Sequence, residues 1–232
     1  PKFQGTAAAH STVELYDGQT PLGTTTADDS GDWTFTVGSA LAEGAHSIKV
    51  IATPIGGSSP AESSALNFIV DTVLPSTSLQ LDSLLTDGVT LATLSQLTSI
   101  AQIQAEAGSS VVITIVDTAK TITKTIASAS GSQELIALTA EEVKALSDGQ
   151  IEITAVVTDA AGNQSTEQSV SFQYRAATPT TPQTISGTTN SEFLWGGTAS
   201  DSITANAGHD HLIGLAGDDI LEGGLGDDTL VG

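Results

Sequence analysis

The sequence predicts an all-β protein in which two β-sandwich domains in tandem precede a short repeat rich in glycine and acidic residues. Three observations predict this class. Thr and Ser occur 33 and 26 times in 232 residues, and this composition favours short pleated strands over helices. Apolar runs alternate with turn residues as far as Tyr174. Beyond Gly187, acidic and apolar residues recur every nine positions.

The net charge of the chain excludes some classes of binding partner. Asp and Glu number 27 against 6 Lys and Arg, which gives a net charge of −21. Such a surface repels nucleic acid and anionic lipid, and no apolar run reaches about 18 residues, so we expect neither nucleic-acid binding nor membrane insertion. With no Cys, a metal would be held by oxygen ligands, which favours calcium.

Both ends of the chain indicate a segment of a longer protein. The first ten residues lack the charged and then apolar pattern of a signal peptide. The last residue, Gly232, falls inside the repeat.

We expect the first sandwich at residues 1–71, where turn signals such as Asp17-Gly18 and the stretch from Gly56 to Pro60 separate the strands. The predicted strands are 12–16, 23–27, 33–37, 46–53 and 65–70. Trp33, with Phe35 and Val37 in alternation after it, is the predicted centre of the core.

The second sandwich is expected at residues 72–175, because Asp71 and Pro75 interrupt the strand pattern between the two sets. Its predicted strands are 100–105, 111–116, 121–126, 134–138, 151–158 and 169–174. A short helix near 140–147 is also expected, since Thr139 and Glu142 form a capping-box pattern.

The chain beyond Arg175 changes character. Residues 176–186, with Pro179 and Pro182, are expected as a stiff polar linker.

Residues 187–232 contain eight acidic residues and no Lys or Arg, so this segment needs counter-ions to fold. Two columns run through it in strict register. The apolar column is Leu194, Ile203, Leu212, Leu221 and Leu230, and the acidic column is Glu192, Asp201, Asp210, Asp219 and Asp228.

This segment resembles the RTX nonapeptide, GGxGxDxUx, most fully at residues 223–231. Leu215, Asn206 and Ala199 replace glycines of the motif, and the first row has Asn190 and Glu192. The resemblance implies a parallel β-roll in which calcium lies between the turns of one row and the second row after it. The residues expected at these sites are Asp201 with Asp219, Asp210 with Asp228, and the turn glycines Gly217 and Gly226. The alternative is a flexible acidic linker without a specific ion.

The two preceding domains resemble bacterial Ig-like modules of large secreted adhesins. Residues 13–18, 22–33, 43–46, 70–72 and 157–163 carry this resemblance. It implies a calcium ion at the junction between modules, with Asp71, Asp159 and Asn163 as its ligands. The alternative is that these residues only cap turns, which is a common role of Asp.

No pattern in the chain supports catalysis. Its four His accompany neither G-x-S-x-G nor H-E-x-x-H, and Asp82 and Asp87 are expected in a loop. We therefore expect a non-enzymatic stalk fragment of a calcium-dependent RTX adhesin, at the cell surface or secreted. The resemblance implies export by type I secretion machinery and adhesion to a surface glycan or protein through other domains. The alternatives are the stalk of an RTX hydrolase or surface-layer protein, and a carbohydrate-binding module.

Overall fold

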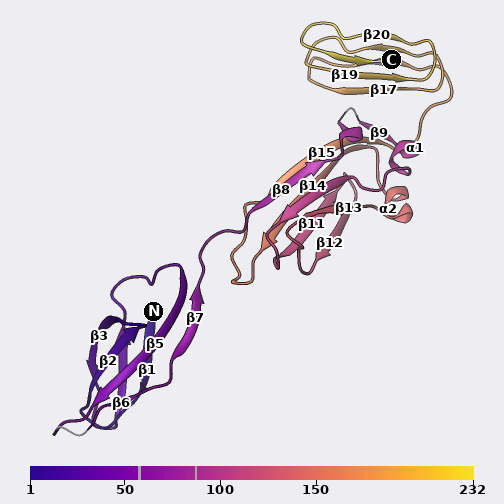
Figure 1. The fold of residues 1–232 in the computed structure, drawn as a ribbon. Helices are drawn as coiled ribbons and strands as arrows, with labels where there is room; N and C mark the ends of the chain where they lie inside the picture. The colour runs from indigo at the N-terminus through magenta and orange to yellow at the C-terminus, as the bar shows by residue number, and fades with distance from the viewer. Residues whose placement is uncertain (57–58, 87) are drawn as a thin grey trace. The chain divides into compact units, whose positions relative to one another are not determined.

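The computed structural model describes residues 1–56, 59–86 and 88–232. Gly57 and Ser58, which belong to a predicted turn signal, and Asp87, which was expected in a loop, lie outside this part. The chain divides into two compact units, Pro1–Val73 and Leu74–Gly232. Strands make up nearly all of the regular structure (Figure 1), which confirms the predicted all-β class.

The first unit pairs a small sheet with a larger one. Strands β1 and β4 are antiparallel, β3, β2, β5 and β6 follow one another in the second sheet, and β7 also pairs with β5. The five predicted strands are present, and β1 and β6 were not predicted. The bounds are β1 Lys2–Thr6, β2 Thr12–Asp17, β3 Thr20–Thr26, β4 Asp32–Thr36, β5 Gly44–Thr53, β6 Ala61–Glu62 and β7 Leu66–Val70.

Trp33 is part of the core of the first unit, as predicted. It is 7% exposed and belongs to the same buried cluster as Val13 and Leu15, the inward-facing residues of β2. A Cβ on Gly5 of β1, the strand paired with β4, would lie 2.7 Å from the Trp33 ring. Glycine therefore lets the indole lie flat against the neighbouring strand.

The second unit contains a sandwich of two sheets, in the orders β13-β10-β8 and β12-β11-β14-β15-β9. Its pairs are antiparallel except that β9 runs parallel to β15. The strands are β8 Thr77–Leu81, β9 Val89–Thr90, β10 Ala101–Ala105, β11 Ser110–Val116, β12 Thr121–Ile126, β13 Gln133–Ile136, β14 Gly149–Thr158 and β15 Gln168–Arg175. Their inward-facing Val and Ile side chains form one continuous core.

The predicted helix is present as α2 (Ala140–Lys144), and Thr139 and Glu142 make both bonds of the capping box. Asp82 lies in a loop just before a 3₁₀ turn, as expected, and Asp87 lies outside the described residues. The segment from 83 to 94 has elements that were not predicted. It contains a 3₁₀ turn, η1 (Ser83–Leu85), strand β9 and helix α1 (Leu91–Leu94). Its apolar side chains explain this, because Leu85, Val89 and Leu94 are at most 2% exposed and extend the core.

Residues 184–231 form a roll of two three-stranded parallel sheets (Figure 1), ordered β16-β18-β20 and β17-β19-β21. The bounds are β16 Thr184–Ser186, β17 Phe193–Gly197, β18 Ser202–Thr204, β19 His211–Leu215, β20 Ile220–Glu222 and β21 Thr229–Val231. β16 lies within the segment expected as a linker, and its Ile185 pairs with Ile203. The roll therefore begins one row earlier than its acidic column.

Within the described residues, no helix has the length and apolar character needed to cross a membrane.

Candidate metal centre

The nine-residue rows follow one another along the roll, and each strand pairs with the strand two rows later. Leu194 of β17 is opposite Leu212 of β19, and Ile203 of β18 is opposite Leu221 of β20. Ile203 and Leu212 have no exposed surface, whereas Leu230 in β21 is 46% exposed. The apolar column therefore fills the roll, as the register of the sequence predicts, and residues 18 apart are stacked neighbours.

The acidic column divides between two edges of the roll. We call the turns 178–183, 196–201 and 214–219 the Asp201 edge, and the turns 187–192, 205–210 and 223–228 the Asp210 edge. On each edge, a carboxylate oxygen accepts the backbone N–H of the residue 18 positions earlier. The N···O distances are 2.6 Å from Gln183 to Asp201, 2.8 Å from Asp201 to Asp219, 2.8 Å from Glu192 to Asp210 and 2.9 Å from Asp210 to Asp228.

Turn glycines bring carbonyl oxygens close to the same edges. Gly217 and Gly226 have φ angles of +125° and +127°, a region that side chains rarely adopt. A Cβ on Gly217 would lie 2.6 Å from the carbonyl oxygen of Ala199, and one on Gly226 would overlap the carbonyl oxygen of Gly208. Because these positions are glycine, the backbone carbonyl oxygen of one turn can lie close to the backbone of the turn two rows later.

The oxygen donors present here fit calcium, which accepts carboxylate and backbone carbonyl ligands together. Among the described residues, no three His, Asp or Glu side chains form a metal-binding group by themselves, so backbone oxygens have to supply part of any site. Among the described residues of the roll, one buried side-chain oxygen lacks a hydrogen-bond partner, Oδ2 of Asp210. The roles of Asp201, Asp210, Asp219, Asp228, Gly217 and Gly226 as ligands stay predictions.

The two histidines of the roll take part in its stacking. His209 Nδ1 accepts the backbone N–H of Asp227 at 3.0 Å, and Ser200 and Ser191 occupy the equivalent position in other rows. The ring of His211 stacks on Phe193 with centroids 4.8 Å apart. Both contacts join residues 18 apart, which places these histidines among the row-to-row contacts of the roll.

At the other predicted site, the structure shows turn-capping contacts. Asp159 Oδ1 accepts the backbone N–H groups of Ala161 and Asn163, both at 2.9 Å, and its Oδ2 accepts the Asn163 side-chain amide at 2.9 Å. The Asn163 side chain is the main cause of the lowered pKa of Asp159. In the first unit, Asp71 Oδ1 accepts the N–H of Val73 at 3.1 Å. A calcium site at the junction stays a prediction.

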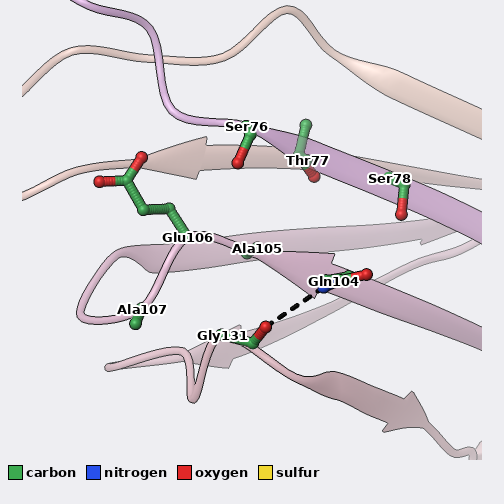
Figure 2. A pocket seen from close by; sticks show the side chains of 8 residues that line it. All are labelled: Ser76, Thr77, Ser78, Gln104, Ala105, Glu106, Ala107 and Gly131. Carbon is green, nitrogen blue, oxygen red and sulfur yellow. Dashed lines mark hydrogen bonds between the residues drawn. The ribbon is translucent and has the colours of Figure 1, made fainter.

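The second sandwich has a shallow pocket of about 540 Å³ beside the start of β8 and the end of β10. Figure 2 shows the Glu106 side chain extending away from the hydrogen bond that joins Gln104 to the carbonyl oxygen of Gly131 at 3.3 Å. The pocket residues are Ser76, Thr77, Ser78, Gln104, Ala105, Glu106, Ala107 and Gly131. This lining has a single carboxylate and no aromatic ring on which a sugar could stack.

Two residues of the roll were missed in the sequence. Gln183 takes the acidic position of the row before Glu192. Ala205 stands at the first position of its row, where the other rows with an acidic residue have glycine. The nine-residue register extended backwards from Glu192 and Leu194 reaches Gln183 and Ile185, so Gln183 could have been found. The effect of Ala205 depends on how the carboxylate beside it packs, which the sequence does not contain.

Two family models match parts of the chain. Residues 1–72 match the bacterial Ig-like domain, and residues 186–232 match the RTX calcium-binding nonapeptide repeat (4 copies). No curated protein matches the sequence.

Several solved structures show partial similarity. The fibronectin(III)-like modules of Clostridium thermocellum CbhA have 16% identity and a TM-score of 0.37, with 75% of this chain and 86% of that chain covered. A tetra-tandem repeat in the extending region of a large adhesion protein has 19% identity and a TM-score of 0.37, with coverage of 75% and 45%. A structure from a 1.5-MDa bacterial ice-binding adhesin has 17% identity and a TM-score of 0.41, with coverage of 76% and 58%.

The chain spans less than two thirds of the two adhesin structures. With TM-scores below 0.5, these similarities do not establish a common arrangement over the whole length. The family matches agree with the strands, the turns and the oxygen-rich edges described above. The chain thus carries a bacterial Ig-like domain at residues 1–72 and RTX calcium-binding repeats at residues 186–232.

Proposed function

We propose that this chain is a stalk segment of a secreted, calcium-dependent adhesin, and that its C-terminal roll folds on binding calcium outside the cell. The order of its parts supports this proposal, because sandwich modules precede a calcium-binding repeat. Sandwiches give a stalk length and stiffness, while the repeat responds to the ion.

The observation that carries the proposal is the set of hydrogen bonds between carboxylates and backbone N–H groups 18 residues apart. These bonds hold Asp201 over Asp219 and Asp210 over Asp228. Like charges stacked in this way repel each other unless a cation lies near them. We propose these four carboxylates as the charged ligands, with carbonyl oxygens admitted by Gly217 and Gly226 completing each site.

The coupling of calcium binding to folding explains why the roll would fold only after export. A ligand that binds only the folded form stabilises it by about 2.7 kcal/mol when its free concentration is 100 times Kd. Calcium is scarce in the cytosol and abundant outside, so the same chain would stay open inside and fold outside. An open acidic tail is also suited to type I secretion machinery, which we propose as its exporter.

The junction residues Asp71, Asp159 and Asn163 form a second proposed calcium site. The two oxygens of Asp159 already accept three N–H donors, and this favours turn capping over ion binding. We therefore propose that the roll binds calcium more tightly than the junction.

Isothermal titration of the full chain with calcium, together with far-UV circular dichroism in chelator and in calcium, tests the proposal. We expect heat of binding and a gain of β signal on adding calcium, and a much smaller response to magnesium because it demands smaller octahedral sites. Equal order of the repeats in chelator and in calcium would contradict the proposal.

A further inference from the structure

Two aspartates of the roll, Asp201 and Asp210, are equally buried, each 2% exposed, but their carboxylates differ. Asp201 has donors for both oxygens: Oδ1 accepts the N–H of Gln183 at 2.6 Å and Oδ2 accepts the N–H of Gly197 at 2.5 Å. The backbone therefore already compensates the charge of Asp201.

Asp210 has a donor for only one oxygen. Its Oδ1 accepts the N–H of Glu192 at 2.8 Å. Its Oδ2 is buried and has no hydrogen-bond partner in the part of the chain that the structure describes. A buried carboxylate oxygen without a donor is costly, because it has lost water and gained nothing in exchange.

Ala205 distinguishes the row of Asp210 from the row of Asp201, which has Gly196 at the same position. At the first position of the other rows that have an acidic residue, an added Cβ would collide with the acidic side chain of the same row. At Gly196 it would lie 2.5 Å from Oδ2 of Asp201, and at Gly214 it would overlap Oδ2 of Asp219. Ala205, which is fully buried, has its methyl group in this position. The carboxylate of Asp210 is therefore excluded from the place where Asp201 finds its second donor.

Other oxygens lie near the carboxylate of Asp210. A Cβ built on Gly208 would lie 2.6 Å from the carbonyl oxygen of Asn190 and 3.0 Å from Oδ1 of Asp210. Asp228, two rows later, accepts the N–H of Asp210 at 2.9 Å. The Asp210 edge thus combines an uncompensated carboxylate oxygen, a nearby carbonyl oxygen and a second acidic residue.

We propose that Asp210 is the leading calcium ligand of the roll, and that Ala205 gives it this role by keeping its Oδ2 free of backbone donors. Calcium then binds first on the Asp210 edge and more weakly on the Asp201 edge. This inference rests on the proposed calcium-binding function and assigns an order to its sites.

Calcium titration calorimetry on the full chain, comparing Asp210→Asn with the matched variant Asp201→Asn, tests the order. We expect Asp210→Asn to weaken the tightest binding step by about tenfold or more, the loss expected when a charged ligand becomes neutral. Asp201→Asn should keep that step and weaken the later one. Equal weakening by the two variants, or a tight step that survives Asp210→Asn, would overturn the inference.

A second pair of variants leaves every carboxylate in place. It tests the order of the sites even where an Asp→Asn variant fails to fold. Ala205→Gly should weaken the tightest step, because Asp210 gains access to a backbone donor. Gly214→Ala should strengthen the weaker step, because the φ of Gly214 is not in the left-handed region and the three atoms nearest to an added methyl group all belong to the Asp219 side chain, which the methyl group would displace. Unchanged affinities in both variants would overturn the role of Ala205. If the unmodified chain binds no calcium, the proposed function itself fails.

Discussion

The second sandwich and the roll each bury an aspartate, and they compensate its charge differently. Asp117, after β11, is 7% exposed, and its oxygens accept the N–H groups of Ala119, Lys120 and Ser147 at 2.6–2.8 Å. Asp210 is 2% exposed and has a donor for Oδ1 alone. The sandwich therefore compensates the charge of Asp117 with its own backbone, and the roll does the same for Asp201. Oδ2 of Asp210 has no such donor among the described residues.

The sandwich also has a larger apolar core than the roll. The sandwich has a continuous buried cluster that includes Ile113, Ile153 and Phe172. In the roll, the buried cluster consists of Ile203, Ala205 and Leu212. Since a fully buried aliphatic side chain contributes about 1.5–3 kcal/mol, the sandwich has the apolar burial to fold alone. In the proposed function, metal binding supplies the rest of the stability of the roll.

The largest expected effects come from truncating one core residue in each region. Ile153→Ala and Leu212→Ala remove fully buried side chains, and such truncations cost about 2–5 kcal/mol. The cost of Ile153→Ala should be the same in calcium and in chelator, while that of Leu212→Ala should appear only in calcium. Urea unfolding followed by circular dichroism measures both. A loss from Leu212→Ala that is equal in both conditions would contradict the comparison.

Replacement of the buried aspartates sharpens the contrast. Asp117→Asn should lower the free energy of unfolding by about 1.5–3 kcal/mol, the range for hydrogen bonds to a charged group, with or without calcium. Burial acts to raise the pKa of Asp117, but the N–H groups of Ser147, Ala119 and Lys120 outweigh it and hold the pKa below 3.8.

The stability that Asp117 provides is therefore present above pH 3.8 and is lost as the pH falls through the lowered pKa. Urea unfolding at several acidic pH values measures this loss, which Asp117→Asn should abolish. Asp210→Asn should act only in calcium. An effect of Asp210→Asn in chelator as large as in calcium would argue that the roll folds without the ion.

A smaller effect is expected at the helix of the sandwich. Thr139→Ala removes the hydroxyl that accepts the Glu142 N–H at 3.2 Å and should cost about 1 kcal/mol. Thr139→Ser keeps the hydroxyl and is the matched control. Because α2 is part of the second sandwich and not of the roll, we expect the loss to be equal in chelator and in calcium, as thermal unfolding would show.

The smallest expected effect on stability is in the first unit, where a histidine side chain compensates the charge of a carboxylate. His46 contacts Asp17 Oδ2 at 2.5 Å through Nδ1 and the Ala42 carbonyl oxygen at 2.7 Å through Nε2. Both partners are acceptors, so the protonated ring, which has an N–H on each nitrogen, can donate to both of them. The Ala42 carbonyl and then Asp17 raise the pKa of His46 above 6.5, and the His46 hydrogen bond is the main cause of the lowered pKa of Asp17.

The stabilisation from His46 is therefore complete below pH 6.5 and is lost as the pH rises through the raised pKa. Calorimetric scans across this range should show the midpoint of the first unit falling with rising pH, and His46→Gln should remove the dependence. A midpoint that rises with pH would contradict the contact.

Periodic features of the fold could be predicted from the sequence, and irregular ones could not. Alternating residues predicted β11 and β14, and the nine-residue register predicted the apolar column, in which Leu194 pairs with Leu212. β16 was missed because its turn has proline and glutamine where later rows have glycine and acid. The contrast between Asp201 and Asp210 was also missed, because it arises from the contact of one methyl group with a carboxylate.

Hydrogen exchange of the full chain, followed by mass spectrometry in chelator and in millimolar calcium, tests the central claim most directly. We predict that peptides from residues 187–231 exchange rapidly in chelator and become protected in calcium, while peptides from β14 stay protected in both. Protection of residues 187–231 in chelator equal to that in calcium would show that the roll folds without the ion and would contradict the account.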